Sequence, residues 1–330
     1  MTEHTPEIPF TPSVYAHAAR LIDRSPWEVS RDADLMAAGH IEAFALYRHA
    51  PVVIGIDIYN LEAEAYGAVV EAPTGTGIPA ISKPLCRTLT ELRELPHFDP
   101  YRAGRVPLVI EAAHRVAEAC PDADVRIPVA GPFSIAANLL GFETLLSAVA
   151  TEPALLTDAL HHLVAGQLTF CRAIVDADLD VAFFESAATP PMMSPAQFRA
   201  VELPALKDIL TGAAEIIGHS VPCVIGGDTE PILEAMLETG TGYLVCPLAT
   251  DQRAFMARMA AHPEVTVRIN MDPRPLLAKN DRAIENEVDR VLGLAHNRPH
   301  VCIGTGALPY EADPDVVLWT RDLISSRTVR

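Results

Sequence analysis

The feature that most constrains this chain is the repeated alternation of short apolar runs with longer helical patterns. The run PVVIGIDIY at 51–59 is rich in Val and Ile, which is typical of a strand covered on both faces. Comparable runs occur at 124–133, 180–188, 222–227, 242–248, 265–273 and 300–306. Amphipathic segments separate these runs, so the pattern predicts parallel strands joined by helical crossovers in an α/β fold.

Two α/β architectures fit this alternation: a closed (β/α)8 TIM-type barrel and an open doubly wound sheet. We favour the barrel because the units are evenly spaced, most strands end in Gly, Asp, Asn or Pro, and no GxGxxG follows the first strand. Periodicity by itself does not exclude the open sheet. We expect residues 1–330 to form one domain, with helical patterns at 14–22 and 30–49 forming an N-terminal appendage within 1–50. The second pattern opens with a Ser-Arg-Asp cap signal at 30–32, the segment 71–80 reads as a loop, and the helical pattern at 143–177 is interrupted near Thr151–Pro153.

Charge and hydropathy restrict the possible partners. The net charge is −18, from 43 acidic and 25 basic side chains, which argues against nucleic acid and anionic membranes as partners. No apolar run reaches the roughly 18 residues of a membrane span, and the N-terminus lacks the apolar stretch of a signal peptide. We therefore expect a cytoplasmic protein, whose six cysteines are mostly buried thiols rather than a disulfide framework.

Acidic residues at the predicted strand ends are the first candidates for catalysis, because active sites lie at the carboxyl ends of parallel strands in both architectures. Asp57 stands between two isoleucines, where burial would favour a proton donor or a binder of ligand N–H groups. Glu185 follows the same logic, and a salt bridge is its alternative role. Asp228 is expected to cap the following helix, and such a helix start can also receive a ligand.

Other residues at the strand ends are expected to line the same pocket: Tyr59, Gly226, Gly227, Asn270, Asp272, Thr305 and Tyr310. The two glycines fit either a tight turn or a pocket floor, and Asp272 also fits a turn before its proline. His219 and Cys223 are four apart but straddle the start of a strand, and the sequence contains no HxH, CxxC or HExxH. No metal site is predicted from these spacings.

Five stretches in order resemble the uroporphyrinogen decarboxylase superfamily, and they are most similar to its corrinoid-linked methyltransferase branch. The resemblance runs from about residue 12 to 325 and implies a (β/α)8 barrel. The five stretches are GIDIYNLEAEAYG (55–67), AGPFSIAANLLG (130–141), SPAQF (194–198), VIGGDTEPILEAMLETG (224–240) and IGTGALPYEADPDVV (303–317).

The resemblance also implies what this chain lacks. In the methyltransferase branch a His-x-Cys-Gly precedes this helix, and its histidine and cysteine fall on Val224 and Gly226. The third zinc ligand of that branch falls on Ala307, so zinc activation of a thiol is not expected. In the decarboxylase branch, Asp57 matches the aspartate that gathers pyrrole N–H groups, but the tyrosine and the histidine fall on Asn138 and Thr305. The arginine-bearing motif near 24–31 is absent.

The resemblance therefore implies a methyltransferase that moves a methyl group between a corrinoid, free or on a partner protein, and a non-thiol molecule such as tetrahydrofolate. Asp57, Glu185 or Asp228 would supply the acid. Two alternatives remain open. One is a decarboxylase or lyase acting on another substrate, and the other is a non-catalytic protein that binds a corrinoid or a tetrapyrrole.

Overall fold

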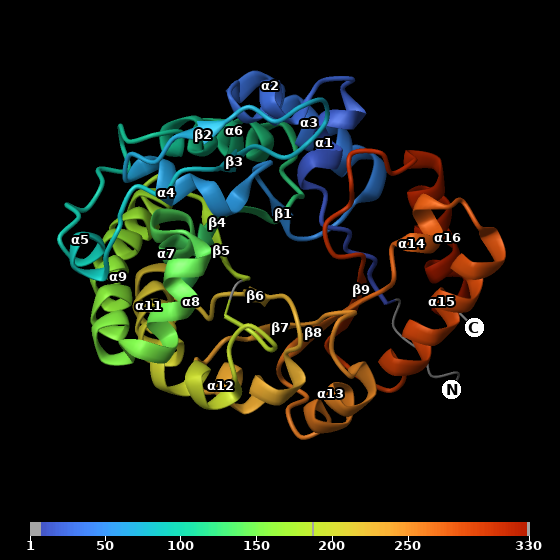
Figure 1. Ribbon diagram of the computed structural model, residues 1–330. Helices are drawn as coiled ribbons and strands as arrows, with labels where there is room; N and C mark the ends of the chain where they lie inside the picture. The colour runs from blue at the N-terminus through green and yellow to red at the C-terminus, as the bar shows by residue number, and fades with distance from the viewer. Residues whose placement is uncertain (1–7, 187, 329–330) are drawn as a thin grey trace.

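Parallel strands form the centre of the molecule. The computed structural model of the chain describes residues 8–186 and 188–328. One sheet has the order β1-β4-β5-β6 and a second has the order β7-β8-β9, and every pair within them is parallel. Their bounds are β1 (Val52–Val53), β4 (Val125–Ala130), β5 (Asp180–Glu185), β6 (Cys223–Ile225), β7 (Tyr243–Cys246), β8 (Thr266–Asn270) and β9 (Val301–Gly304). The two sheets curve into one TIM-type barrel, as predicted (Figure 1).

The N-terminal segment supplies an eighth parallel unit. Phe10 and Ser13 pair in parallel with Ile303 and Ala307. Thr11 N donates to Ile303 O at 2.7 Å, and Ile303 N donates to Pro9 O at 2.9 Å. This pairing joins chain segments almost 300 residues apart, and local sequence patterns did not reveal it.

Helices surround the ring of strands (Figure 1). The helices of the outer layer are α6 (Val106–Ala119), α9 (Pro153–Val175), α11 (Leu203–Ile217), α12 (Leu233–Leu237), α13 (Gln252–Met259), α15 (Asp281–Ala295) and α16 (Pro314–Thr328). The N-terminal helices are α1 (Tyr15–Leu21), α2 (Pro26–Ser30) and α3 (Ala33–Tyr47), and Asp32 caps α3 by accepting from Leu35 N at 3.0 Å. The predicted interruption near Thr151–Pro153 is confirmed, because α8 (Phe142–Thr151) ends just before α9, which begins at Pro153.

Shorter helices and helical turns lie in the connections between these elements. They are α4 (Leu61–Ala65), α5 (Leu89–Arg93), α7 (Pro132–Leu140), α8 (Phe142–Thr151), α10 (Pro195–Gln197), α14 (Arg274–Leu277), the 3-10 turns η1 (Ile58–Asn60) and η3 (Glu230–Ile232), and the π-helix η2 (Phe198–Glu202). The segment 71–80, expected to be a loop, is closed by an antiparallel pair, β2 (Val70–Glu71) with β3 (Ala80–Ile81). Among the described residues no single helix is long and apolar enough to cross a membrane, and only the pair α7 and α8, bent by 117°, meets that test together.

The strand predicted at 51–59 is much shorter than expected. It ends at Val53, and Gly55 adopts φ 140° while its N–H donates to His40 Nε2 at 3.1 Å. Further along, Glu62 Oε1 of α4 accepts the N–H of Ala130 at 2.6 Å, where a continued β1 would have supplied a carbonyl. Side chains therefore replace the strand at this edge of the barrel.

Residue alternation separates two apolar regions. Along β5, Ala182 and Phe184 belong to a small cluster inside the barrel with Ile58, Val53 and neighbouring tyrosines. Val181 and Phe183 belong to the large core between the barrel and its helices. Successive strand residues thus face the lumen and the helical layer in turn.

A group of buried histidines joins α1 and α3 to the barrel. His17 Nε2 lies 2.7 Å from the Tyr47 hydroxyl, and the His49 ring packs against Tyr47 with centroids 6.4 Å apart. Burial lowers the pKa of His17 and of His40 to about 4 and the pKa of His49 to about 3. All three rings are therefore neutral in the folded protein at neutral pH.

These histidines predict a loss of stability in mild acid. Below pH 6.5 the histidines of the unfolded chain take up protons, whereas the buried histidines of the folded chain stay neutral until about pH 4. The free energy of unfolding therefore decreases as the pH falls through this window. Each histidine contributes up to about 1.4 kcal/mol per pH unit. We expect His49→Phe to reduce the pH dependence of the free energy of unfolding between pH 6.5 and 4, measured by urea denaturation. The exposed His114→Gln is the control, and an unchanged slope in His49→Phe would contradict the assignment.

Candidate active site

The lumen at the carboxyl ends of the strands has an aromatic wall. The rings of Tyr15 and Tyr59 meet Phe184 edge-on, with centroids 6.2 and 6.4 Å away. Burial raises the pKa of Tyr15 to about 12 and also raises the pKa of Tyr59. Both phenols therefore keep their protons at neutral pH, and the wall offers apolar surface together with hydroxyl donors.

Gly226 and Gly227 have different reasons to be glycine. A Cβ at Gly226 would meet no atom within 4 Å, so open space lies beside it at the end of β6. Gly227 has φ 86°, and a Cβ there would collide with the Thr189 hydroxyl, which donates to Gly226 O at 3.0 Å. The turn thus needs Gly227, whereas Gly226 leaves room beside the lumen.

Asp228 does not cap the following helix, so that prediction is wrong. Its Oδ1 accepts from the Thr250 hydroxyl at 2.7 Å, and the same hydroxyl accepts from Glu230 N at 2.8 Å. The cap position of η3 belongs to Thr229, whose side chain makes no capping bond. Asp228 is half-buried and links the loops after β6 and β7 at the rim of the barrel.

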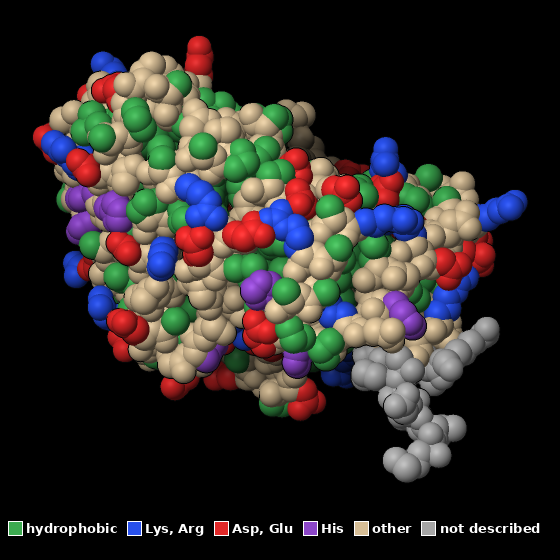
Figure 2. All heavy atoms as spheres, turned by 90° about the horizontal axis from the view of Figure 1, so that it is seen from below, with side chains coloured by type: hydrophobic (Ala, Val, Ile, Leu, Met, Phe, Trp, Pro, Cys, Tyr) green, Lys and Arg blue, Asp and Glu red, His purple; other side chains and the backbone are tan. Residues whose placement is uncertain are grey.

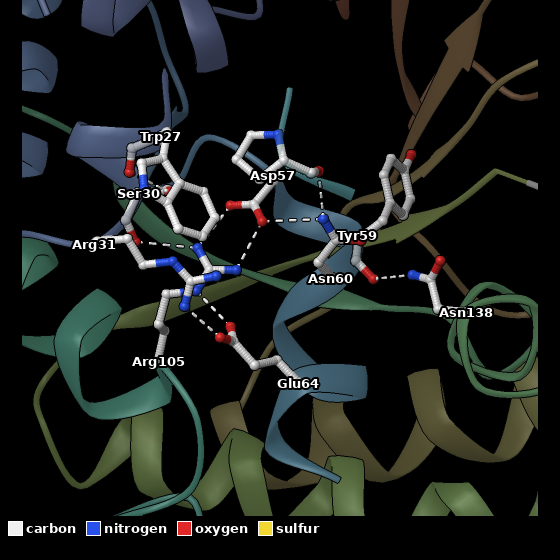
Figure 3. Close-up of polar contacts among 10 residues, drawn as sticks. Trp27, Ser30, Arg31, Asp57, Tyr59, Asn60, Glu64, Arg105 and Asn138 are labelled. Atoms are coloured by element: carbon white, nitrogen blue, oxygen red, sulfur yellow. Dashed lines mark hydrogen bonds and ion pairs between the residues drawn. The ribbon is translucent and has the colours of Figure 1, made fainter. Parts of the chain in front are cut away.

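Asp57 lies in a buried ion-pair network rather than against the lumen (Figure 3). Arg105 donates to both carboxylate oxygens at 2.7 Å, and Asn60 Nδ2 donates to Oδ2 at 3.0 Å. Arg105 Nε also donates to Glu64 at 2.5 Å, and Arg31 pairs with Glu64. The Asp57 and Arg105 side chains are only 2% and 6% exposed. This pairing gives Asp57 a structural role, while its use in catalysis stays a prediction.

Glu185 points outward from β5, beneath the N-terminus of α7. The Ser134 hydroxyl and Ser186 N (3.0 Å) donate to Oε1, and the N–H groups of Phe133 (3.2 Å) and Ser134 (3.3 Å) donate to Oε2. Gly131 makes room for this carboxyl group, because a Cβ there would overlap Oε2. The structure thus places Glu185 in the layer between the barrel and the helices.

Glu202 of the π-helix lies next to Glu185. It is fully buried, and its carboxyl group shares a side-chain hydrogen bond with Glu185, while its oxygens have no other partner among the described residues. Burial, and then the neighbouring Glu185, raise the pKa of Glu202 well above 4.5, and burial also raises the pKa of Glu185. Both effects favour the protonated form of Glu202 in the folded protein. Sequence reasoning missed it, although a π-helix often marks a functional position.

The remaining candidates divide between the lumen and the rim. Asn270 is 8% exposed on the luminal face of β8, and its Oδ1 has no partner among the described residues. Asn138 Nδ2 donates to Tyr59 O at 2.6 Å and so holds the loop that carries the tyrosine. Asp272 pairs with exposed Arg274 at 2.6 Å. The Thr305 hydroxyl bonds to the next residue's carbonyl at 2.8 Å, and Tyr310 packs half-buried against the core.

Sequence reasoning also missed Arg268, a buried residue of β8 that faces the lumen beside a cavity of about 20 Å³. The signal was present, because Arg268 and Asn270 alternate with the apolar Val267 and Ile269 along one strand. A much larger cavity, about 1290 Å³, opens instead at the amino ends of the strands. Its lining includes Ile8 and Thr328, the two ends of the described chain, and none of the predicted site residues. Residues 8–186 and 188–328 contain no cluster of three or more His, Cys, Asp or Glu side chains suited to a metal.

Comparisons with known proteins agree with this geometry. A family profile described as "Uroporphyrinogen decarboxylase (URO-D)" matches residues 2–325. A comparison with curated proteins finds no match. Among solved structures, a "methyltransferase from Methanosarcina mazei" aligns at 20% identity over 96% of this chain and 94% of its own, with a TM-score of 0.80. At this identity the likeness shows the fold, and it agrees with the TIM-type barrel.

Two nearby arginines test the role of the buried network. We expect Arg105→Met to lower the free energy of unfolding by about 3–5 kcal/mol, because it leaves buried carboxylates without their partner. Arg102→Met is the matched control, since that side chain is 84% exposed and, among the described residues, pairs only with Asp99. Denaturant titrations would measure both. Equal, small losses in the two variants would contradict the structural role of Arg105.

The buried Glu202 predicts that the protein loses stability as the pH rises. Its raised pKa means that the folded protein holds a proton that the unfolded chain releases above about pH 4.5, so stability is lost as the pH rises. We expect Glu202→Gln to reduce this loss by up to about 1.4 kcal/mol per pH unit, measured by urea denaturation from pH 5 to 9. Exposed Glu42→Gln should keep the wild-type profile. A profile in Glu202→Gln identical to wild type would show that Glu202 is ionised in the folded protein.

Proposed function

The chain belongs to the uroporphyrinogen decarboxylase family, and from that premise we propose that it is a methyltransferase acting between a corrinoid and a non-thiol small molecule such as tetrahydrofolate. The methyltransferase chemistry of the similar structure supports the reaction class in this proposal. The corrinoid is a substrate here, either free or carried by a partner protein. The aromatic wall of Tyr15, Tyr59 and Phe184 suits a flat ring system such as a pterin.

The choice of a non-thiol partner rests on the side chains at three positions of the chain. The resemblance places the zinc ligands of the corrinoid-linked branch at Val224, Gly226 and Ala307, and none of these side chains has an atom that binds a metal. Val224 is half-buried in the lumen wall, and Gly226 leaves open space. The residues present do not fit zinc, so these three positions supply no metal to hold a thiol as thiolate.

Proton transfer is the remaining chemical need of such a reaction. Loss of a methyl group from N5 of a reduced folate leaves an electron pair on nitrogen, which a proton then neutralises. Of the three predicted acids, Asp57 and Glu185 are enclosed by donors, whereas Asp228 is half-buried at the rim and accepts only from Thr250 among the described residues. We assign the proton transfer to Asp228, directly or through one water.

A carboxy-lyase acting on another substrate is the second candidate. The specific observation in its favour is Arg268, a buried cation in the lumen that would attract a carboxylated substrate. The two functions differ in their product, because only the lyase releases carbon dioxide. Incubation of the protein with candidate carboxylic acids and measurement of released carbon dioxide would favour this alternative.

Methyl transfer can be tested with purified protein, methylcobalamin and tetrahydrofolate. We expect the visible spectrum of the corrinoid to change as methyltetrahydrofolate forms, and Asp228→Asn to lower kcat by about 10²–10⁴-fold. Asp122→Asn, an exposed carboxylate in the loop before β4, is the control and should retain full activity. No spectral change with any acceptor, although the corrinoid binds, would refute the proposal. Stoichiometric zinc in fresh protein would show that the ligand positions are misassigned.

A further inference from the structure

The barrel lumen contains a buried positive charge with no acidic partner. Arg268 is 7% exposed, and its Nη1 donates to the Ser13 hydroxyl at 3.0 Å. Its Nε has no partner in the described chain, and no carboxylate of residues 8–186 or 188–328 pairs with it. An arginine cannot shed its proton in a protein, and a buried unpaired charge costs several kcal/mol. This cost needs a compensating interaction.

The chain has enough acidic side chains to have supplied a partner for Arg268. The chain has 43 acidic and 25 basic side chains, and the equally buried Arg105 is held by two carboxylates. The residues that surround Arg268 are instead neutral: Ser13, Tyr15, Tyr59, Tyr243 and Cys302. The fold therefore neutralises one buried arginine internally and leaves the other without an internal counter-charge.

The surroundings of Arg268 are shaped to receive a small group. The adjoining cavity of about 20 Å³ is lined by Ser13, Tyr15, Phe184, Val224 and Tyr243 together with Arg268, and it holds a group about the size of one water. Gly304 makes this arrangement possible, because a Cβ there would lie 2.6 Å from both Arg268 Cδ and Asn270 Oδ1. Two polar side chains of β8 are thus admitted to the lumen by one glycine of β9.

We propose that Arg268 is the anchor for a carboxylate group of the small-molecule substrate, bound inside the barrel lumen. The guanidinium offers a planar fork that matches a carboxylate, and the tyrosine hydroxyls and the Asn270 amide supply further donors. The cavity has room for about one carboxylate oxygen in place of a water. The inference rests on the proposed function only in taking the lumen as the reaction site.

Small carboxylates are the probes for this site. Sodium formate and sodium acetate are titrated against the full chain at constant ionic strength, with chloride as the balancing anion. We expect Tm to rise with the logarithm of the anion concentration above Kd, by about 2 °C near ten times Kd. Arg268→Met should abolish the rise, and Arg268→Lys should weaken binding about tenfold because the fork is lost. The exposed Arg253→Met is the control and should respond as wild type does.

A second measurement separates an anchor from a structural arginine. In buffer whose only anion is chloride, we expect Arg268→Met to unfold at the same or a higher Tm than wild type, whereas a structural arginine would cost stability. The proposal is overturned if formate and acetate act no differently from chloride on the wild type, or if Arg268→Met responds equally. If Arg268→Met does not fold, the Arg268→Lys titration decides alone. Neither corrinoid nor folate is present, so failure of methyl transfer leaves this result unaffected.

Discussion

The alternation of side chains along the parallel barrel strands is the constraint on which the rest of the structure depends. On β5 it turns Phe184 into the lumen and Glu185 outward, and on β8 it turns Arg268 and Asn270 inward. Register adds a second condition, since the pairing of Ala130 with Phe184 brings Gly131 beside Glu185. A shift of one residue on either strand would exchange a buried carboxyl group for a luminal one.

Two buried arginines show how the same residue serves different ends. Arg105 lies between Asp57 and Glu64, so its charge is neutralised inside the fold and ties the loop after β1 to the loop before α6. Arg268 is equally buried but faces serine, tyrosine and cysteine side chains. Because a buried charge without compensation is costly, Arg105 with its two carboxylates stabilises the fold. For the same reason we infer that Arg268 binds an anionic group of a ligand.

Glycines shape the lumen as much as the polar side chains do. Gly304 admits Arg268 and Asn270, Gly227 permits the turn after β6, and Gly226 leaves open space where the resemblance would place a metal-binding cysteine. The three positions that would hold the zinc of the corrinoid-linked branch are Val224, Gly226 and Ala307, so at these positions this lumen has no metal site to hold a thiolate. It has instead the means to bind a flat molecule that carries an acidic group, which is why we propose a non-thiol methyl partner.

The sequence by itself determined the order of strands and helices, the cap at Asp32, the interruption before Pro153 and the family resemblance, because local periodicity and residue preferences carry that information. Only the tertiary structure decided that Phe10 pairs with Ile303, and that Asp57 faces Arg105 rather than the lumen. The same holds for the absence of an acidic partner at Arg268 within the described chain. These outcomes depend on which distant segments pack around each residue, and no local pattern in the sequence records that.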